Sequence, residues 1–466
     1  MKPQVKFFTI LCSGMLAVIA LNAAKPLYHP TGIIVRANQS ITPHSGPVTP
    51  RKASDFLNSI GVNSAVSTRG ESLKKTIEIT KYLGVRWIRS GYEGNVPVAD
   101  LIEVYKQAGV RFSYGLLSGG TDIDRLLKGG RELADAGALL AFEGLNEPNN
   151  WDVTYNGEKG GKEQSWMAVA KVQRDLYSAV KKDTSLKKYP VWSLSENGAQ
   201  TDNTGLQFLE IPKGAGAAMP DGTKYADYAN CHNYFMHPSH PGLYDNQTWN
   251  AADPGLLCKV DGLYGNYGST WRAKFKGYEG EALQNLPRVT TETGATINGE
   301  LTEEKQARMF LNLYLAQFAR GWSYTALYLL RDRSDEAGNQ TFGFYKPDYT
   351  PRKSALYMHN LTSILAEPAT GTENVAEVSK PVKLNYSIAK LPETTHHLLL
   401  QKSNGKFALI VWAEKVKGED EVKITFENAV SGKVYDPTLG SLPVSSVENS
   451  NAVTLTLSDH PMIIEI

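Results

Sequence analysis

Two glutamates stand at the ends of apolar segments that are typical of buried strands. Glu147 lies in Asn146-Glu147-Pro148-Asn149, just after Ala138–Phe142, and Glu292 lies in Thr290-Thr291-Glu292-Thr293. A charged side chain at such a place needs a reason, because glutamate is seldom buried without a partner. A loop-start cap or a structural ion pair explains either glutamate taken alone. Together, two carboxyl groups at two strand ends indicate acid/base chemistry on a polysaccharide.

From Phe56 to Leu365, short apolar segments alternate with helical ones. The predicted strands are Ile60–Val66, Val85–Arg89, Val110–Leu117, Leu139–Leu145, Val191–Leu194, Ala229–His232, Val289–Glu292 and Tyr324–Leu330. The predicted helices include Ser72–Leu83, Val98–Ala108, Ile123–Ala136, Glu163–Lys182, Thr302–Arg320 and a closing helix at Pro351–Leu365. Eight such units predict an α/β fold, a (β/α)8 TIM barrel over residues 55–366. An open doubly wound sheet is the alternative, disfavoured because no Gly-rich phosphate loop follows the first strand.

After residue 366 the pattern changes to short, often alternating apolar runs. They are Leu384–Leu391, His397–Gln401, Phe407–Ala413, Val422–Phe426, Val453–Leu457 and Met462–Ile466. This pattern predicts a C-terminal β-sandwich over residues 367–466. Residues 25–54, rich in Pro, Ser, Thr and Gly, are interpreted as a linker with one short strand candidate at Gly32–Val35.

Four motifs at predicted strand ends give the chain a resemblance to the clan A glycoside hydrolases. Asn146-Glu147-Pro148 resembles the acid/base motif on strand four, and Thr291-Glu292-Thr293-Gly294 resembles the nucleophile motif on strand seven. Arg89, ending strand two, is similar to the arginine near the nucleophile, and His232-Asn233-Tyr234 resembles the His-x-Tyr pattern after strand six. The resemblance covers about Asp55 to Leu365, with a C-terminal β-domain like that of family 39.

The resemblance implies hydrolysis of β-glycosidic bonds with retention of configuration. Glu292 would attack the anomeric carbon, while Glu147 would donate a proton to the leaving oxygen and then activate water. We therefore expect the carboxyl groups to lie about 5–5.5 Å apart, whereas about 9 Å would favour inversion. Arg89 should keep Glu292 ionised, while burial and the neighbouring negative charge should keep Glu147 protonated. Asn146 would hydrogen-bond the 2-hydroxyl of the sugar.

Further side chains are expected to support this site. Tyr234 could orient Glu292, and His232 could hold a carboxylate or the sugar. Tyr328 is better placed on strand eight than Trp322 to form the floor of the sugar subsite. Glu143 is expected deeper in the barrel, on the same face as Leu145 and Glu147 and paired with Arg86 or Arg89. Other candidates are the loop aromatics Trp151, Tyr155, Trp249, Tyr264, Tyr267 and Trp271, then Glu196 and Asn197, and an acidic rim of Asp332, Asp335, Glu336 and Asn339.

Composition narrows the classes of partner. Lys and Arg total 49 against 48 Asp and Glu, a formal charge of +1 that suggests neither nucleic acid nor an anionic membrane. A carbohydrate substrate is the expected partner. No His/Cys cluster has zinc spacing, so neither a metal nor another cofactor is expected.

The N-terminal residues predict export. Lys2 and Lys6 precede an apolar stretch to Leu21, and Ala23-Ala24 supplies small residues for cleavage, so residues 1–24 read as a signal peptide. The expected location is secreted or periplasmic, without stable membrane association, and an uncleaved anchor is the alternative. Cys231 and Cys258 could then pair in an oxidising compartment or stay as two separate buried thiols.

Two other functions use the same residues. One is a carbohydrate-binding protein on a barrel without activity, which the presence of both Glu147 and Glu292 disfavours. The other is a transglycosylase, in which a sugar rather than water resolves the intermediate.

Overall fold

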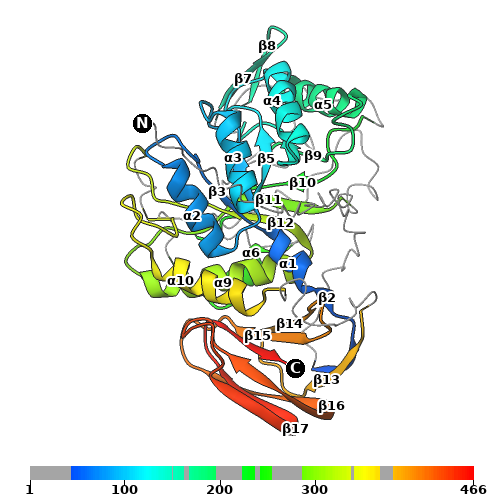
Figure 1. The fold of residues 1–466 in the computed structure, drawn as a ribbon, viewed down its shortest axis with the longest axis vertical. Coiled ribbons are helices and arrows are strands. Elements are labelled where there is room, and N and C mark those ends of the chain that lie inside the picture. Colours follow the sequence, from blue (N-terminus) through cyan, green and yellow to red (C-terminus); the bar gives the residue numbers. More distant parts are fainter. Residues whose placement is uncertain are drawn as a thin grey trace, which may run out of the picture. The chain divides into compact units, whose positions relative to one another are not determined.

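Two eight-stranded β-sheets organise the chain (Figure 1). The computed structural model describes residues 43–148, 151–161, 167–195, 223–236, 242–253, 286–336, 341–367 and 381–466. All of these residues belong to one compact unit, Gly32–Ile466.

The first sheet is parallel and closes into a barrel. Its strands are β3 (Ile60–Asn63), β4 (Trp87–Ser90), β5 (Arg111–Gly115), β6 (Leu139–Glu143), β9 (Val191–Trp192), β10 (Ala229–Asn230), β11 (Arg288–Thr293) and β12 (Trp322–Leu327). They pair in the order β10-β11-β12-β3-β4-β5-β6-β9, and a parallel bridge from Trp192 to Tyr228 joins the last strand back to the first. Each strand overlaps one predicted segment, so the predicted (β/α)8 barrel is confirmed.

Helices lie outside these strands (Figure 1). They are α1 (Ala53–Ser59), α2 (Leu73–Leu83), α3 (Val98–Ala108), α4 (Ile123–Asp135), α5 (Met167–Lys182), α6 (Gln247–Ala251), α9 (Glu303–Ala319) and α10 (Lys353–Ile364). Local signals set several ends. Gly84 and Gly109 end α2 and α3 with φ of 71° and 69°, a left-handed conformation that glycine adopts readily. The Thr302 hydroxyl caps α9 by accepting from the Lys305 N–H at 3.3 Å.

Aromatic side chains fill one end of the barrel interior. Trp87, Trp192 and Tyr324 contact one another with ring centroids 5.3–5.9 Å apart. Gly61 makes room for them, because a Cβ there would lie 2.1 Å from the Trp87 ring. Trp322, at the start of β12, is fully buried and donates its indole N–H to the Ala252 carbonyl at 2.9 Å. A functional site is therefore expected at the opposite end of the barrel, where the strands end.

The second sheet forms the C-terminal domain. Its strands are β1 (His44–Val48), β2 (Arg51–Lys52), β13 (Leu384–Ile388), β14 (Thr395–Gln401), β15 (Phe407–Ala413), β16 (Asp420–Tyr435), β17 (Ser445–Leu457) and β18 (Pro461–Glu465). The order is β1-β13-β16-β18-β15-β14-β2, with β17 beside β16. The long strand β16 pairs with β13 in its first half and β18 in its second, so the sheet curls around its own core. The predicted β-sandwich is confirmed.

The interpretation of residues 25–54 as a linker is wrong for the described part of that segment. Strand β1 pairs antiparallel with β13, and β2 pairs parallel with β14, so residues 44–52 complete both edges of the C-terminal sheet. Such pairing depends on partners more than 300 residues away, which local composition cannot reveal. Pro47 is tolerated because β1 is an edge strand. Gly32–Val35 lies outside the described residues.

The β14–β15 hairpin is buried on both faces. Leu399, Leu409 and Val411 belong to the core inside the curled sheet. Their neighbours Leu398, Leu400 and Ile410 belong to the core that includes residues of α9 and α10. Alternation of side chains across a strand therefore divides each strand between two cores. The C-terminal domain therefore packs against the helices α9 and α10 on the outside of the barrel.

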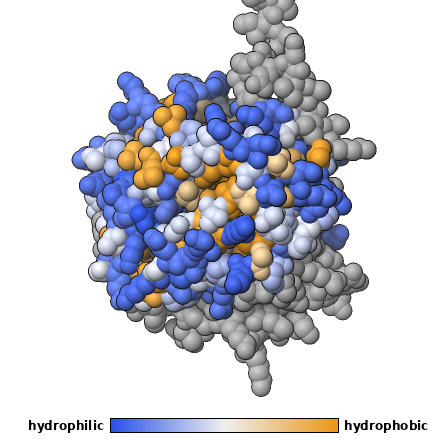
Figure 2. Space-filling view, turned by 90° about the horizontal axis from the view of Figure 1, so that it is seen from below, coloured by the Kyte–Doolittle hydropathy of each residue, from blue (hydrophilic) through white to orange (hydrophobic). Residues whose placement is uncertain are grey.

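The described surface is mostly polar on the face turned downward in Figure 1. Figure 2 shows hydrophilic residues over most of that face, with an apolar band across its middle. None of the helices in the described ranges is long and apolar enough to cross a membrane. The predicted signal segment, residues 1–24, lies outside those ranges.

His460 should make stability depend on pH. Its ring lies 3.3 Å from Asp436 and 3.1 Å from Asp459, and Asp459 also pairs with Arg308 of α9 at 2.9 Å. Burial lowers the pKa of His460, but the two aspartates outweigh it and raise the pKa from 6.5 to about 9. Because the folded value is the higher one, the stabilisation is complete below pH 6.5 and is lost as pH rises through 9.

We expect His460→Gln to lower the free energy of unfolding by roughly 1–3 kcal/mol near pH 6, as measured by urea unfolding. A difference from the parent chain that is just as large above pH 9 would contradict this expectation.

Candidate active site

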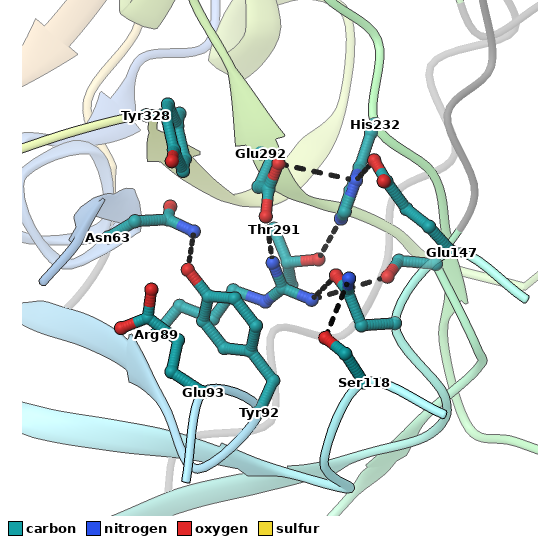
Figure 3. A network of polar contacts seen from close by, with 12 residues as sticks. Asn63, Arg89, Tyr92, Glu93, Ser118, Glu147, His232, Thr291, Glu292 and Tyr328 are labelled. Atoms are coloured by element: carbon teal, nitrogen blue, oxygen red, sulfur yellow. Dashed lines mark hydrogen bonds and ion pairs between the residues drawn. The ribbon is translucent and has the colours of Figure 1, made fainter. Parts of the chain in front are cut away.

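Arg89, at the end region of β4, is the centre of a buried polar network (Figure 3). Its Nε and Nη2 donate to the Glu143 carboxylate at 3.0 and 2.7 Å, and its Nη1 donates to Glu292. Nη2 also donates to the Asn146 Oδ1 at 2.8 Å. The guanidinium is fully buried and lies over the Tyr92 ring, 3.9 Å from its centroid. The predicted contacts of Arg89 with Glu292 and Glu143 are both confirmed.

The end of strand four turns Asn146 and Glu147 toward this network. Strand β6 ends at Glu143, and the chain continues through a parallel bridge between Asn146 and Ser195. The Glu147 N–H donates to the Ser195 carbonyl at 2.8 Å, and Glu147 has a φ of 41°. Glu143 and Glu147 both face this site, as expected, since the Thr291 hydroxyl contacts Glu143 and His232 contacts Glu147. Asn146 faces it as well, because it bonds the same guanidinium as Glu143. Alternation stops where the regular strand stops.

Strand seven presents two adjacent side chains to the site. The Thr291 hydroxyl lies 2.9 Å from a Glu143 oxygen, and the next residue, Glu292, bonds Arg89. Neighbours on a regular strand point to opposite faces, so β11 must be irregular here. The pairing of β11 with β12 does shift register between Thr290 and Thr293. This bulge-type irregularity re-aims the side chains, as such features do next to active sites.

His232 and Tyr234 come from the loop after β10 and contact both glutamates. The His232 Nδ1 lies 2.7 Å from Glu147 Oε1 and 3.5 Å from Glu292 Oε2, and its Nε2 lies 3.1 Å from the Thr291 hydroxyl. The Tyr234 hydroxyl donates to Glu292 Oε2 at 2.8 Å. The contacts expected of both side chains with the carboxyl groups are confirmed. Their roles in a reaction stay predictions.

The two glutamates lie close together. One ligand atom from each of Glu147, His232 and Glu292 falls within 4.8 Å of the others. In the described part of the chain these three could also hold a metal ion, since two carboxylates and an imidazole are suitable ligands. However, Arg89 already supplies a buried positive charge to Glu292, and a second cation there would be repelled.

Burial shifts the protonation of the site. Burial raises the pKa of Glu292 above its usual range, and His232, Arg89 and the Tyr234 hydrogen bond oppose that rise. As expected, Arg89 lowers the pKa of Glu292 and so favours its ionised form. Burial outweighs this effect, so the net shift of the pKa is upward. Burial lowers the pKa of His232 to about 4, so its ring is neutral at neutral pH. The protonation of Glu147 stays a prediction.

Strand eight contributes Tyr328 rather than Trp322, as expected from position. The Tyr328 ring lies 6.5 Å from that of Tyr234, and its hydroxyl donates to Glu336 at 2.5 Å. Trp151 lies in the loop after Glu147, with its N–H on the Glu147 carbonyl at 3.2 Å and its side chain 48% exposed. Tyr328 therefore belongs to the site, whereas Trp151 can take part only as an exposed rim residue.

The remaining predicted residues divide into three groups. Tyr155 bonds Asp175 at 2.9 Å, and Trp249 stacks on His396 of the C-terminal domain, so both have packing partners. Asp332 was expected in a solvated rim, but this expectation is wrong: the side chain is fully buried, pairs with Arg352 and accepts from the Gly343 N–H at 2.6 Å. Outside the described residues lie Glu196, Asn197, Cys258, Tyr264, Tyr267, Trp271 and Asn339.

Several residues of the network were not predicted. Asn230 donates to the Thr291 hydroxyl at 2.9 Å, and Ser118 accepts from the Asn146 amide at 3.2 Å. Asn63 donates to the Tyr92 hydroxyl at 3.3 Å. Ser118 directly follows the predicted strand Val110–Leu117, so a search for polar residues at predicted strand ends would have found it. Asn63 and Asn230 end β3 and β10, but the predicted strands extended past both, so that search would have missed them.

Similarity to known proteins was found at the level of structure. No family model and no curated protein matches the chain. A family 39 glycoside hydrolase from the gut symbiont Bacteroides cellulosilyticus has a TM-score of 0.53 at 15% identity, over 90% of this chain and 83% of that one. A bifunctional glucanase-xylanase from a metagenome library has a TM-score of 0.53 at 11% identity, over 90% and 97%. The family 51 arabinofuranosidase of Xanthomonas axonopodis has a TM-score of 0.53 at 10% identity, over 91% and 99%.

The chain has the fold of the clan A glycoside hydrolases. At these identities the likeness establishes the architecture and not the reaction. What the site does must therefore be argued from its own geometry.

Proposed function

We propose that the chain is a retaining glycoside hydrolase that cleaves β-glycosidic bonds in a poly- or oligosaccharide. The observation that carries this proposal is the close approach of Glu147 and Glu292, with carboxylate oxygens within 4.8 Å. Retaining enzymes place their carboxyl groups about 5–5.5 Å apart, while inverting enzymes need about 6.5–9.5 Å to fit a water molecule. The spacing supports direct attack by one carboxylate on the sugar.

A count of protons supports Glu147 as the acid. The Thr291 hydroxyl has one hydrogen and two acceptors, the Glu143 carboxylate at 2.9 Å and the Asn230 Oδ1 at 3.2 Å, so in either case it does not donate to His232. The His232 Nε2 must then be the donor to Thr291, and the neutral ring has no second N–H. Its Nδ1 is left to accept from Glu147 at 2.7 Å, which requires a protonated Glu147.

Glu292 has the opposite surroundings. Three groups act on its carboxylate: Arg89 and Tyr234 donate to it, and the His232 ring lies 3.5 Å away. Burial raises the pKa of Glu292, but a donor on each of its oxygens opposes that rise, so the ionised form is the state we assign to it in the reaction. The ionised carboxylate attacks the anomeric carbon while Glu147 gives its proton to the leaving oxygen. Glu147 then takes a proton from the water that releases the sugar from Glu292.

The stereochemistry of the first product tests the proposal. A panel of aryl β-glycosides and polysaccharides would identify a substrate, and proton NMR of the first minutes of hydrolysis would show the anomer released. We expect the β-anomer. The α-anomer would exclude retention, and binding without hydrolysis across the panel would favour a carbohydrate-binding protein. A transglycosylase would give longer or transferred products at high acceptor concentration.

Replacing Tyr234 by Phe should move the acidic limb of the pH profile of kcat/KM. The Tyr234 hydroxyl lowers the pKa of Glu292, and activity is lost as pH falls through that pKa. Without this hydroxyl the limb should move to higher pH by about one unit, and kcat/KM should fall about tenfold. Tyr324→Phe, in the aromatic layer at the far end of the barrel, is the matched control. An unmoved limb in Tyr234→Phe would show that the hydrogen bond does not set the ionisation of Glu292.

Export and the absence of a cofactor are part of the same proposal. The signal-like residues 1–24 support secretion or delivery to the periplasm. Retaining hydrolysis by two glutamates requires neither a metal nor an organic cofactor. The partner is the carbohydrate itself.

A further inference from the structure

The loop that carries His232 and Tyr234 is held in place by the short helix α6. The Gln247 side chain donates to the Phe235 carbonyl at 2.8 Å, and the Asn233 side chain donates to the Ala251 carbonyl at 3.0 Å. Phe235 and Ala251 are also fully buried in one apolar core. Asn233, between His232 and Tyr234, and Phe235, directly after them, are thus tied to the last and the first residue of α6.

The C-terminal domain, in turn, caps the start of α6. Glu414 follows β15, and its Oε2 accepts from the backbone N–H of Thr248 at 2.9 Å and of Trp249 at 3.2 Å. Its Oε1 accepts from the Thr248 hydroxyl at 2.5 Å. These are N–H groups that the first turn of a helix leaves without partners. The cap is therefore supplied by a residue that lies 166 positions further along the chain.

The same domain holds the residues around that cap. Asn246 donates to the Glu393 carbonyl at 3.0 Å, and its Oδ1 lies 2.7 Å from the His396 Nε2. The ring of Trp249 stacks on His396 with centroids 3.9 Å apart. A helix of five residues does not persist by itself in water, so these contacts decide whether α6 forms.

We propose that the C-terminal domain is a positioning element of the active site, with Glu414 fixing α6 and, through it, the loop of His232 and Tyr234. The expected effect on catalysis rests on the proposed function. The expected effect on the position of the loop rests only on the contacts described above. Glu414 is buried in the protein, where a carboxylate is costly unless hydrogen bonds compensate it. The groups that donate to it within the described ranges lie on α6 or on Trp412 beside it.

Three variants separate positioning from general stability. Glu414→Ala removes the cap. Glu414→Gln keeps an oxygen that accepts from the Thr248 and Trp249 N–H groups, so it should restore most of the effect. The matched control is Lys402→Met, which removes another buried charge joining the C-terminal domain to the barrel, through the Ile364 carbonyl of α10 at 2.7 Å.

Hydrogen exchange is the first measurement, because it needs no substrate. In Glu414→Ala, the amides of residues 231–236 and 247–251 should exchange at least about tenfold faster, and in Lys402→Met they should not. Equal protection of these amides in Glu414→Ala and the parent chain would overturn the inference, whether or not the chain proves to be a hydrolase.

Kinetics are the second measurement, at a temperature well below every unfolding transition. In Glu414→Ala, kcat/KM should fall about 10- to 100-fold, since small misplacement of catalytic groups costs this much. The acidic limb should also move to higher pH, as in Tyr234→Phe, because Glu292 loses the groups that lower its pKa. A purely stabilising role would lower the melting temperature and leave the limb where it is, which would overturn the kinetic part. An inactive parent chain would instead refute the proposed function.

Discussion

Glu292→Ala should lower kcat on any substrate that the parent chain hydrolyses by at least about four orders of magnitude. The reason is that the carboxylate supplies the new bond in the first step, and nothing else in the described site lies where it could do so. Glu143 is fully buried and accepts three hydrogen bonds from Arg89, and Glu147 carries the proton in the proposed state.

The folded structure should survive this change. Arg89 keeps Glu143 and Asn146 as partners when Glu292 is removed, so no buried charge is left unpaired. Burial also raises the pKa of Glu292, which means that its ionised form is held at a cost in the folded state. The melting temperature of Glu292→Ala should therefore be equal to or higher than that of the parent chain, as is common when a strained active-site group is removed.

Covalent trapping makes the assignment specific. A 2-deoxy-2-fluoro glycoside with a good leaving group should accumulate as a glycosyl ester on the parent chain, and peptide mass spectrometry should place it on Glu292. Glu292→Ala should show no label. The control is Glu158→Ala, in the short strand Glu158–Gly161 that follows β6 in the chain, and it should be labelled like the parent. Full hydrolytic activity in Glu292→Ala, or a label on Glu143, would overturn the assignment of the nucleophile.

Much of this site was accessible from the sequence because its signals are local. A charged residue at or just after the end of a predicted strand, as at Arg89, Glu147 and Glu292, marks the end of a barrel strand. Glycines such as Gly84 mark helix ends for an equally local reason, their tolerance of positive φ. When all strands are parallel, knowing the ends of the strands is enough to bring these side chains together.

The features that were not predicted depend on partners distant in sequence. The register shift in β11, which lets Thr291 and Glu292 both reach the site, is a property of its pairing with β12. The strands at residues 44–52 form only because β13 and β14 offer them free edges. In the sequence, Glu414 is a polar residue that follows a strand, and only its contact with α6 in the folded chain indicates a role for it. The composition of each of these segments therefore does not indicate the contact that it makes in the folded chain.

The same distinction explains why the reaction is better defined than the substrate. In the proposed reaction, the groups that would act on the glycosidic bond are at strand ends, and their positions are fixed by contacts with Arg89, His232 and Tyr234. The groups that would recognise individual sugars lie on the longer loops, such as the one carrying the exposed Trp151. Loop composition predicts where such recognition takes place and not which sugar it favours.

Glu147→Gln should separate the two steps of the proposed reaction. An amide cannot give up a proton, so hydrolysis of glycans, whose leaving oxygen needs one, should fall about 10²- to 10⁴-fold. Aryl glycosides with a strongly acidic phenol leave without that help, and their first step should be much less affected. The second step then becomes slow for every substrate, because water is no longer activated, and the glycosyl ester on Glu292 should accumulate as a burst.

The proton arrangement at His232 makes this variant a fair test. The side-chain amide introduced by Glu147→Gln can donate an N–H to the His232 Nδ1, much as the protonated carboxyl group does at 2.7 Å, so the loop after β10 should keep its place. Added azide needs no base, and it should restore turnover of the aryl glycoside and give the β-glycosyl azide, formed by two inversions. An α-glycosyl azide would mean that Glu147 is the nucleophile. Equal losses for glycans and for activated aryl glycosides, with no effect of azide, would mean that Glu147 holds the substrate and does not transfer the proton.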